Sequence, residues 1–183
     1  MNRKLSLLPL LFLLAALPAH AQFVLSAVGG LSVTPRIGIH GFETDGVAYE
    51  PELSYGLTVG YGLTERIGLA VASDYGSLNG NPMFHTDATV RFTHRNVQTA
   101  WRPYLGLGVG YLSIDVGQTA LTGVGPKFEL GTAYFVTPSI AVDLGLQVTS
   151  IDVDPEAGMP IIFRNSQNLR SGRLMVGVSF YLN

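Results

Sequence analysis

The histidines are the residues of this chain best suited to acid–base chemistry, but their spacing is not that of a catalytic site. Acyl transfer needs a hydroxyl nucleophile beside a histidine base that an acidic group orients. A serine two residues after a histidine, on the same strand face, would supply the first two groups. None of His40, His85 and His94 is followed by a serine at that distance. We therefore expect no catalytic residues, no cofactor and no enzyme activity.

His85 and Asp87 are the strongest candidates for metal ligands. Residues two apart share one face of a strand, and His40 is expected at a similar height on another strand. A metal site needs about three converging ligands, and these two strands are not neighbours in the fold derived below. We therefore expect the three side chains to lie in water at a rim, without a metal.

A larger set of charged residues falls on one parity of alternating segments. Charged side chains are costly when they are alone in a narrow interior, but paired and hydrogen-bonded groups can fill it. We expect an interior charge network that plugs the protein; a thin polar pore or a gate is the alternative. The predicted members are Glu50, Glu52, Asp74, Asp87, Arg91, Lys127, Glu129, Asp143 and Arg173.

Long amphipathic strands must hold these groups, and the segment from Ser139 to Ile151 is the clearest of them. From Ile140 to Thr149 its odd positions are polar or small, as at Asp143, and its even positions are apolar, as at Leu144. A period of two is typical of a strand with one apolar face. The length matches the roughly 9–11 residues that a tilted strand needs to cross a membrane.

Eight segments are predicted to be such strands, which indicates an all-β, closed, antiparallel, up-and-down transmembrane barrel. Lipid cannot satisfy free backbone groups, so membrane-spanning strands must close on themselves. An interior of eight strands is just wide enough for side chains to fill. The segments are 23–33 (an extension to 41 also fits), 49–61, 67–75, 84–94, 101–114, 124–134, 139–151 and 170–182.

The connections alternate in length, which predicts the orientation. Short connections at 62–66, 95–100 and 135–138 alternate with longer ones at 42–46, 76–83, 115–123 and 152–169. Outer-membrane barrels have short periplasmic turns and longer extracellular loops. Both ends of the barrel domain should therefore lie in the periplasm.

Aromatic residues on the apolar parity gather at the two ends of the predicted strands. Such girdles are typical of both membrane interfaces, so the apolar face should meet lipid and the charged face the lumen. A soluble periplasmic barrel such as a lipocalin would invert the faces. The predicted periplasmic girdle is Phe23, Tyr61, Phe92, Trp101, Tyr134 and Phe180; the outer girdle is Tyr49, Tyr75, Phe84 and Tyr111.

Composition and the first residues predict the compartment. Asn2-Arg3-Lys4, an apolar run and Ala19-His20-Ala21 have the pattern of a secretory signal peptide, so we expect a signal at 1–21 and a barrel at 22–183. Charged residues make up 13% of the chain, where about 25% is usual. There is no cysteine, which excludes a disulfide framework, and no basic patch for nucleic acid.

The chain resembles the small outer-membrane barrels related to the OmpA transmembrane domain and to OmpX/Ail. The resemblance covers 22–183 and rests on the signal, the strand count and the run from Trp101 to Tyr111, WRPYLGLGVGY. The end, GVSFYL, is similar to the signal that the barrel assembly machinery reads, although it closes on Asn183. The lipid A deacylases, similar small barrels, use a His-x-Ser pair, which this chain lacks.

The resemblance implies outer-membrane lipid, periplasmic export chaperones and the assembly machinery of a Gram-negative-type envelope as partners. We expect a non-enzymatic outer-membrane protein with a structural or surface-contact role. A narrow porin-like channel or a carrier of small apolar molecules is the alternative. The loop 152–169 is the first candidate for contact, with an unidentified surface ligand. Its apolar run is Ile161, Ile162 and Phe163, a run that also fits rim packing or lipid contact.

Overall fold

The computed structural model describes residues 30–44, 47–94, 99–116, 119–153 and 168–182. Its strands are β1 (Leu31–Thr44), β2 (Val47–Ala48), β3 (Glu52–Gly62), β4 (Ile67–Leu78), β5 (Asn81–Thr93), β6 (Trp101–Val116), β7 (Thr119–Thr137), β8 (Ile140–Val153) and β9 (Asn168–Leu182). None of the described residues belongs to a helix long and apolar enough to span a membrane.

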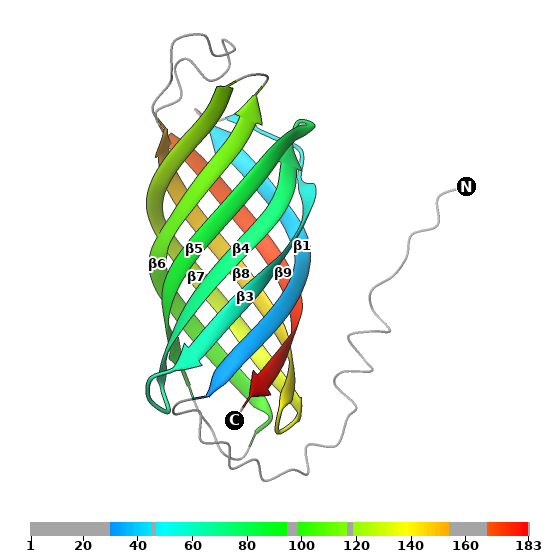
Figure 1. Cartoon of the computed structure of the whole chain (residues 1–183), viewed down its shortest axis with the longest axis vertical. Helices are drawn as coiled ribbons and strands as arrows, with labels where there is room; N and C mark the ends of the chain where they lie inside the picture. The colour runs from blue at the N-terminus through cyan, green and yellow to red at the C-terminus, as the bar shows by residue number, and fades with distance from the viewer. Residues whose placement is uncertain (1–29, 45–46, 95–98, 117–118, 154–167, 183) are drawn as a thin grey trace, which may run out of the picture.

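Eight of the strands form a closed antiparallel barrel, which confirms the predicted fold (Figure 1). Each strand from β3 to β8 pairs with the next along the chain, β1 pairs with β3, and β1 also pairs with β9 to close the cylinder. The ninth element, β2, is a two-residue strand that pairs with the end of β1. Closure leaves no long unpaired edge, which a sheet in lipid cannot tolerate.

The barrel has two distinct ends. β1 begins and β9 finishes at the lower end of Figure 1, which we call the terminal end. β8 finishes and β9 begins at the opposite end, which we call the far end. The predicted orientation makes the terminal end periplasmic and the far end extracellular.

The strands extend further toward the far end than the sequence predicts. β4 and β5 run through most of the predicted 76–83 loop and meet at Asn79 and Gly80, which have φ of 51° and 78°. Positive φ at both central residues is typical of a type I′ turn, whose twist matches that of a hairpin. β6 and β7 likewise extend into the predicted 115–123 loop. Two of the four far-end connections are therefore mostly strand.

The predicted extension of the first strand to 41 is confirmed. β1 occupies Leu31–Thr44 and pairs with β3 from Leu31 to His40, so the end of the 23–33 segment and its extension form one strand, whereas residues 23–29 fall outside the described residues. Phe42, assigned to a loop by its flanking turn residues, belongs to β1 and is 3% exposed. Phe42 points inward like Arg36 and His40, because the alternation of β1 continues through it without a break.

Candidate functional site within the barrel

The outer face of the barrel is an apolar belt. Leu107 is 51% exposed and Leu144 is 45% exposed, whereas Glu129 on the opposite parity is fully buried. An exposed belt of this extent is unusual for a protein in water and is the surface that a lipid bilayer requires.

Most of the predicted girdle residues are exposed on this belt, and two are not. Tyr134 is only 6% exposed, because its ring lies against Trp101 with centroids 4.7 Å apart. Tyr49 is partly buried and packs against an interior apolar cluster. Phe23 falls outside the described residues. The exposed members are Tyr61, Phe92, Trp101 and Phe180 toward the terminal end and Tyr75, Phe84 and Tyr111 toward the far end.

Arg173 lies in the middle of the interior and joins three buried partners. Its Nη1 donates to Asp74 Oδ2 at 2.7 Å and to His85 Nδ1 at 2.8 Å, and its Nη2 donates to Asp87 Oδ2 at 3.2 Å. Arg36 reaches Asp74 from another strand, with Nε donating to Oδ1 at 2.8 Å. Two guanidinium groups thus bind one carboxylate across the barrel axis.

Lys127 and Glu129 continue the network toward the terminal end. Lys127 Nζ donates to Asp87 Oδ1 at 2.5 Å and lies 3.5 Å from Glu129 Oε2. Arg91 Nη2 and Gln147 Nε2 both donate to Glu129 Oε1, at 2.7 Å and 3.0 Å. Each charge is therefore compensated by a partner of opposite sign, as an interior of low dielectric demands.

Two residues predicted to belong to this network, Glu50 and Glu52, lie outside it. Glu50 is exposed and lies in the connection between β2 and β3, outside any strand. Glu52 begins β3 at the far-end rim, where it accepts hydrogen bonds from Ser77 Oγ and from the Asn79 amide. Through these two hydrogen bonds Glu52 stabilises the β4–β5 turn. Its carboxylate therefore faces the rim and takes no part in the charge network on the barrel axis.

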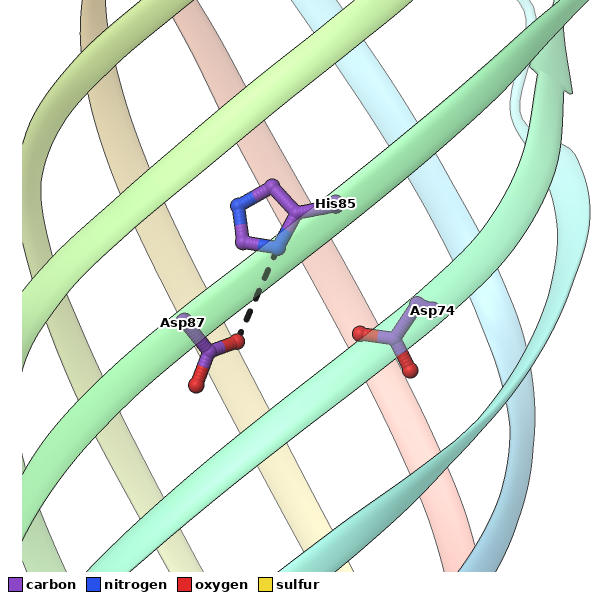
Figure 2. Close-up of side chains that lie close together, drawn as sticks. All are labelled: Asp74, His85 and Asp87. Carbon is purple, nitrogen blue, oxygen red and sulfur yellow. Dashed lines mark ion pairs between the residues drawn. The ribbon is translucent and has the colours of Figure 1, made fainter.

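The expectation of water-exposed rim histidines was wrong. His40 and His85 are each 1% exposed and Asp87 is 2% exposed. Figure 2 shows His85 and Asp87 from β5 facing Asp74 from β4 in the interior. The extended far-end hairpins move the rim outward, so these positions lie deep in the barrel.

Asp74, His85 and Asp87 are the one described group with the ligand types and spacing of a metal site, with ligand atoms within 4.8 Å of one another. All three groups already bind Arg173. An arginine nitrogen only donates, so His85 Nδ1 accepts here. The guanidinium supplies the positive charge that a metal would bring, and the cluster fits a charge network better than a metal centre.

Glycines make room for the long interior side chains. A Cβ at Gly106 would lie 2.7 Å from Thr89 Cγ2 and 3.1 Å from Glu129 Oε2. A Cβ at Gly131 would lie 2.4 Å from the Tyr104 hydroxyl. Distances below about 3 Å cannot be accommodated without displacement in a close-packed interior. The glycine-rich parity is therefore a requirement of the network that faces it.

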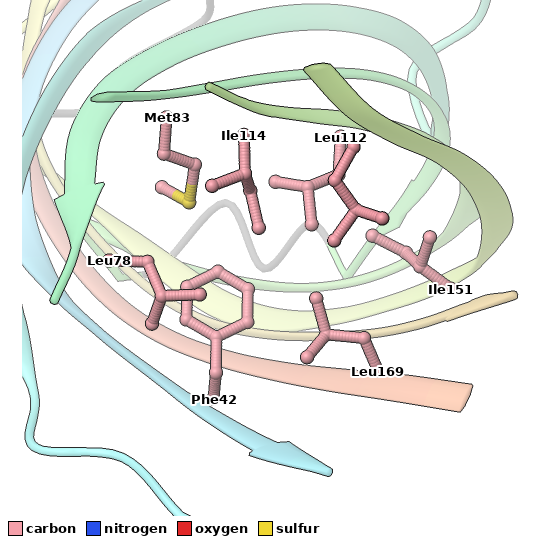
Figure 3. Close-up of a cluster of buried hydrophobic side chains, with 8 residues drawn as sticks. Phe42, Leu78, Met83, Leu112, Ile114, Ile151 and Leu169 are labelled. Carbon is pink, nitrogen blue, oxygen red and sulfur yellow. The ribbon is translucent and has the colours of Figure 1, made fainter. Parts of the chain in front are cut away.

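An apolar cluster fills the lumen at the far end (Figure 3). Its side chains come from seven of the eight barrel strands, all except β3, and point inward toward one another. All are at most 3% exposed. This far-end plug consists of Phe42, Leu78, Met83, Leu112, Ile114, Leu121, Ile151 and Leu169.

A pocket of about 120 Å³ opens at the terminal end, on the other side of the charge network. Arg91, Tyr104 and Asp143 line its inner part, and Phe135 and Tyr181 line its wall. The Tyr104 hydroxyl donates to Asp143 Oδ1 at 2.9 Å, and the Arg91 guanidinium stacks 4.7 Å above the Tyr104 ring. Asp143 thus lies in the lumen as predicted, but in this pocket and not in the central cluster.

Sequence reasoning missed several interior partners. Arg36, His85 and Gln147 bind members of the network, and Tyr104 binds Asp143. All four sit on the inward parity, which was the available signal. The candidate contact residues Ile161, Ile162 and Phe163 fall outside the described residues.

Solved structures with this fold are similar in architecture. Neisserial surface protein A matches with a TM-score of 0.66 and 21% identity over 83% of this chain and 98% of that one. The N-terminal barrel of Pseudomonas aeruginosa OprF matches with a TM-score of 0.58 and 16% identity, over 85% of this chain and 98% of that one. Yersinia pestis Ail, the attachment invasion locus protein, matches with a TM-score of 0.57 and 14% identity, over 85% of this chain and 99% of that one.

The sequence itself identifies the family. A comparison with curated proteins finds no match, but the model of the outer membrane protein beta-barrel domain matches residues 7–181. That match covers nearly the whole chain and agrees with the closed barrel, the apolar belt and the resemblance stated from the sequence. The chain belongs to the outer membrane β-barrel domain family and is an outer-membrane barrel.

Proposed function

We propose that this protein is a non-enzymatic outer-membrane barrel that acts through contacts at its extracellular, far end. The observation that carries this proposal is the filled lumen. The far-end plug and the charge network block the axis one after the other. Because the interior side chains pack against one another, the far-end rim is the surface at which a partner could bind.

The charge distribution indicates what kind of partner the far end favours. In the barrel interior, including the terminal-end pocket, Arg36, Arg91, Lys127 and Arg173 balance Asp74, Asp87, Glu129 and Asp143. Among the described residues of the far end, the acidic side chains of Glu43, Glu50, Glu52 and Asp115 outnumber the one basic side chain, Arg170. The surplus negative charge of the barrel is therefore at one end, and it favours a basic partner through complementarity and steering.

A binding experiment tests this surface role. The mature chain in phosphatidylcholine nanodiscs should be retained on immobilised poly-lysine and not on heparin, and the retention should fall as salt rises. Empty nanodiscs are the control. Replacing Glu43, Glu50 and Asp115 by glutamine should weaken retention, because all three carboxylates are exposed. Equal retention on heparin, or no loss in the triple variant, would contradict the proposal.

The deletion of residues 156–165 separates the role of the longest loop from that of the barrel. We expect the shortened chain to fold and keep its heat-modifiable gel mobility, because the described barrel pairing ends at Val153 and resumes at Asn168. Poly-lysine binding should persist, because the deletion removes Glu156 and Arg164 together and leaves the net charge unchanged. A shortened chain that fails to assemble would show that the loop is structural.

A carrier of small apolar molecules is the second candidate. The far-end plug favours it, because eight apolar side chains line the axis there. Displacement of those side chains would open an apolar path. Uptake of a fluorescent fatty acid into proteoliposomes would support this role over surface contact.

A further inference from the structure

The terminal-end pocket is lined by the exposed side chains of Glu65 and Arg66, by Arg102 over the Phe135 ring, and by two interior residues of opposite charge, Arg91 and Asp143, that form no salt bridge with each other. Arg91 uses Nε and Nη2 to bind Glu129, at 3.3 Å and 2.7 Å. Its side chain keeps 19% exposure, and it lines the pocket. Neither of its described hydrogen bonds uses Nη1, so this nitrogen is available to a molecule in the pocket.

Asp143 is the complementary group. Its Oδ1 accepts the Tyr104 hydroxyl, and its half-buried side chain also lines the pocket. Within the described part of the chain, no salt bridge of 4.0 Å or less joins Asp143 to Arg91, although the two interact electrostatically. Tyr104 separates them: the guanidinium lies over its ring and the carboxylate binds its hydroxyl.

We propose that the terminal-end pocket binds a small zwitterion of the α-amino-acid class. The ligand's carboxylate would accept from Arg91, its ammonium group would donate to Asp143, and a short side chain would contact Ala133 and Phe135. This geometry uses both open charges at once and adds charge-assisted hydrogen bonds of the strong kind.

The neutrality of the interior explains why a zwitterion is favoured over a simple ion. The four interior cations, Arg36, Arg91, Lys127 and Arg173, are balanced by four anions only when Asp143 of the pocket is counted with Asp74, Asp87 and Glu129. A monovalent anion or cation would leave one uncompensated charge beside a buried network, which is costly. A zwitterion adds a charge of each sign and leaves the balance unchanged.

The size of the pocket limits the ligand. Its volume of about 120 Å³ is several times the roughly 10–15 Å³ that one water needs by the same measure. It is also below the roughly 300–1,000 Å³ of pockets for drug-sized ligands. The far-end plug closes the other side of the interior, so the site is a blind pocket that is reached from the periplasm.

The test compares three molecules of similar size on the folded mature chain in nanodiscs: L-alanine, propionate and ethylamine. L-Alanine should shift the amide NMR signals of Thr93 and Tyr181, which line the pocket, and leave Leu112 in the far-end plug unmoved. Propionate and ethylamine should each bind at least about tenfold more weakly, because each lacks one charge-assisted hydrogen bond. Equal binding of propionate, or no shift with any of the three, would overturn the proposal.

Two variants and a control locate the site. Asp143→Asn keeps an acceptor for Tyr104 but removes the charge. L-Alanine should therefore bind at least about tenfold more weakly, while the affinity for propionate should not fall. Ser32 lines the pocket from the start of β1 and is in none of the described salt bridges, so Ser32→Phe should fill the pocket and abolish L-alanine binding. Asp115→Asn, at the exposed far end, should change nothing. Unaltered L-alanine binding in both pocket variants would contradict the assignment.

Discussion

Arg173 shows how a charged residue can be tolerated inside a narrow barrel. It is 1% exposed and shares Asp74, His85 and Asp87 as hydrogen-bond partners. Removing one member of a buried ionic network leaves the others desolvated and uncompensated, which costs more than the network contributes in total. The stability of the barrel should therefore respond strongly to this single position.

The variant Arg173→Leu should lower the free energy of unfolding by about 3–5 kcal/mol. Arg170→Leu is the matched control, because it removes the same side chain from an exposed site on the same strand and should cost less than about 1 kcal/mol. Urea unfolding of both variants in phospholipid vesicles measures the difference. Equal losses would show that the buried network does not depend on Arg173.

Leu144 tests the outer face. It is 45% exposed in the middle part of β8, so Leu144→Arg places a charge in the hydrocarbon and should cost about 2–4 kcal/mol. Leu31→Arg, at the terminal-end start of β1, should cost only about 0–1 kcal/mol because it lies near the interface. The same urea titration measures both, and a depth-independent cost would contradict a lipid-facing belt.

Residue parity could be predicted from the sequence, but contact partners could not. Alternation correctly separates Leu144 from Asp143 because a strand has a period of two. It says nothing about register, so it could not show that Arg36 reaches Asp74 or that His85 binds Arg173. Those contacts depend on the stagger between strands, which sets the heights of side chains around the barrel.

At the scale of elements, the far-end hairpins differ most from the sequence-based expectation. Gly76 and Ser77 read as loop residues, yet β4 continues to Leu78 because its inward apolar positions pack into the far-end plug. Tertiary packing thus overrides local turn propensity. Tyr134 was misplaced for a similar reason: its exposure depends on the neighbouring Trp101 ring and not on parity alone.

The two-residue turn between β4 and β5 should be sensitive to a side chain at Gly80. Its φ of 78° is strained for β-branched residues, so Gly80→Val should destabilise the barrel by about 1–3 kcal/mol. Gly80→Asn should be nearly neutral, because asparagine tolerates this region. The temperature at which gel mobility changes measures both; an unaffected valine variant would show that the turn is not of type I′.

At the scale of the whole molecule, the interior is arranged in three layers along one axis. The far-end plug is apolar, the centre is a balanced charge network, and the terminal end is a small mixed pocket. The sequence predicted a filled lumen of charges but not this order, because the order depends on where each strand begins. The layered interior supports the proposal that the barrel is closed to ions and acts through contacts at its far end.

Planar-bilayer conductance tests this claim most directly. The folded mature chain, inserted at increasing protein concentration, should produce no unitary current steps, because the plug and the network together fill the axis. An open porin measured in the same bilayer verifies that steps are detectable. Reproducible unitary steps from the wild-type chain, proportional to the amount inserted, would show a continuous water path and contradict the account.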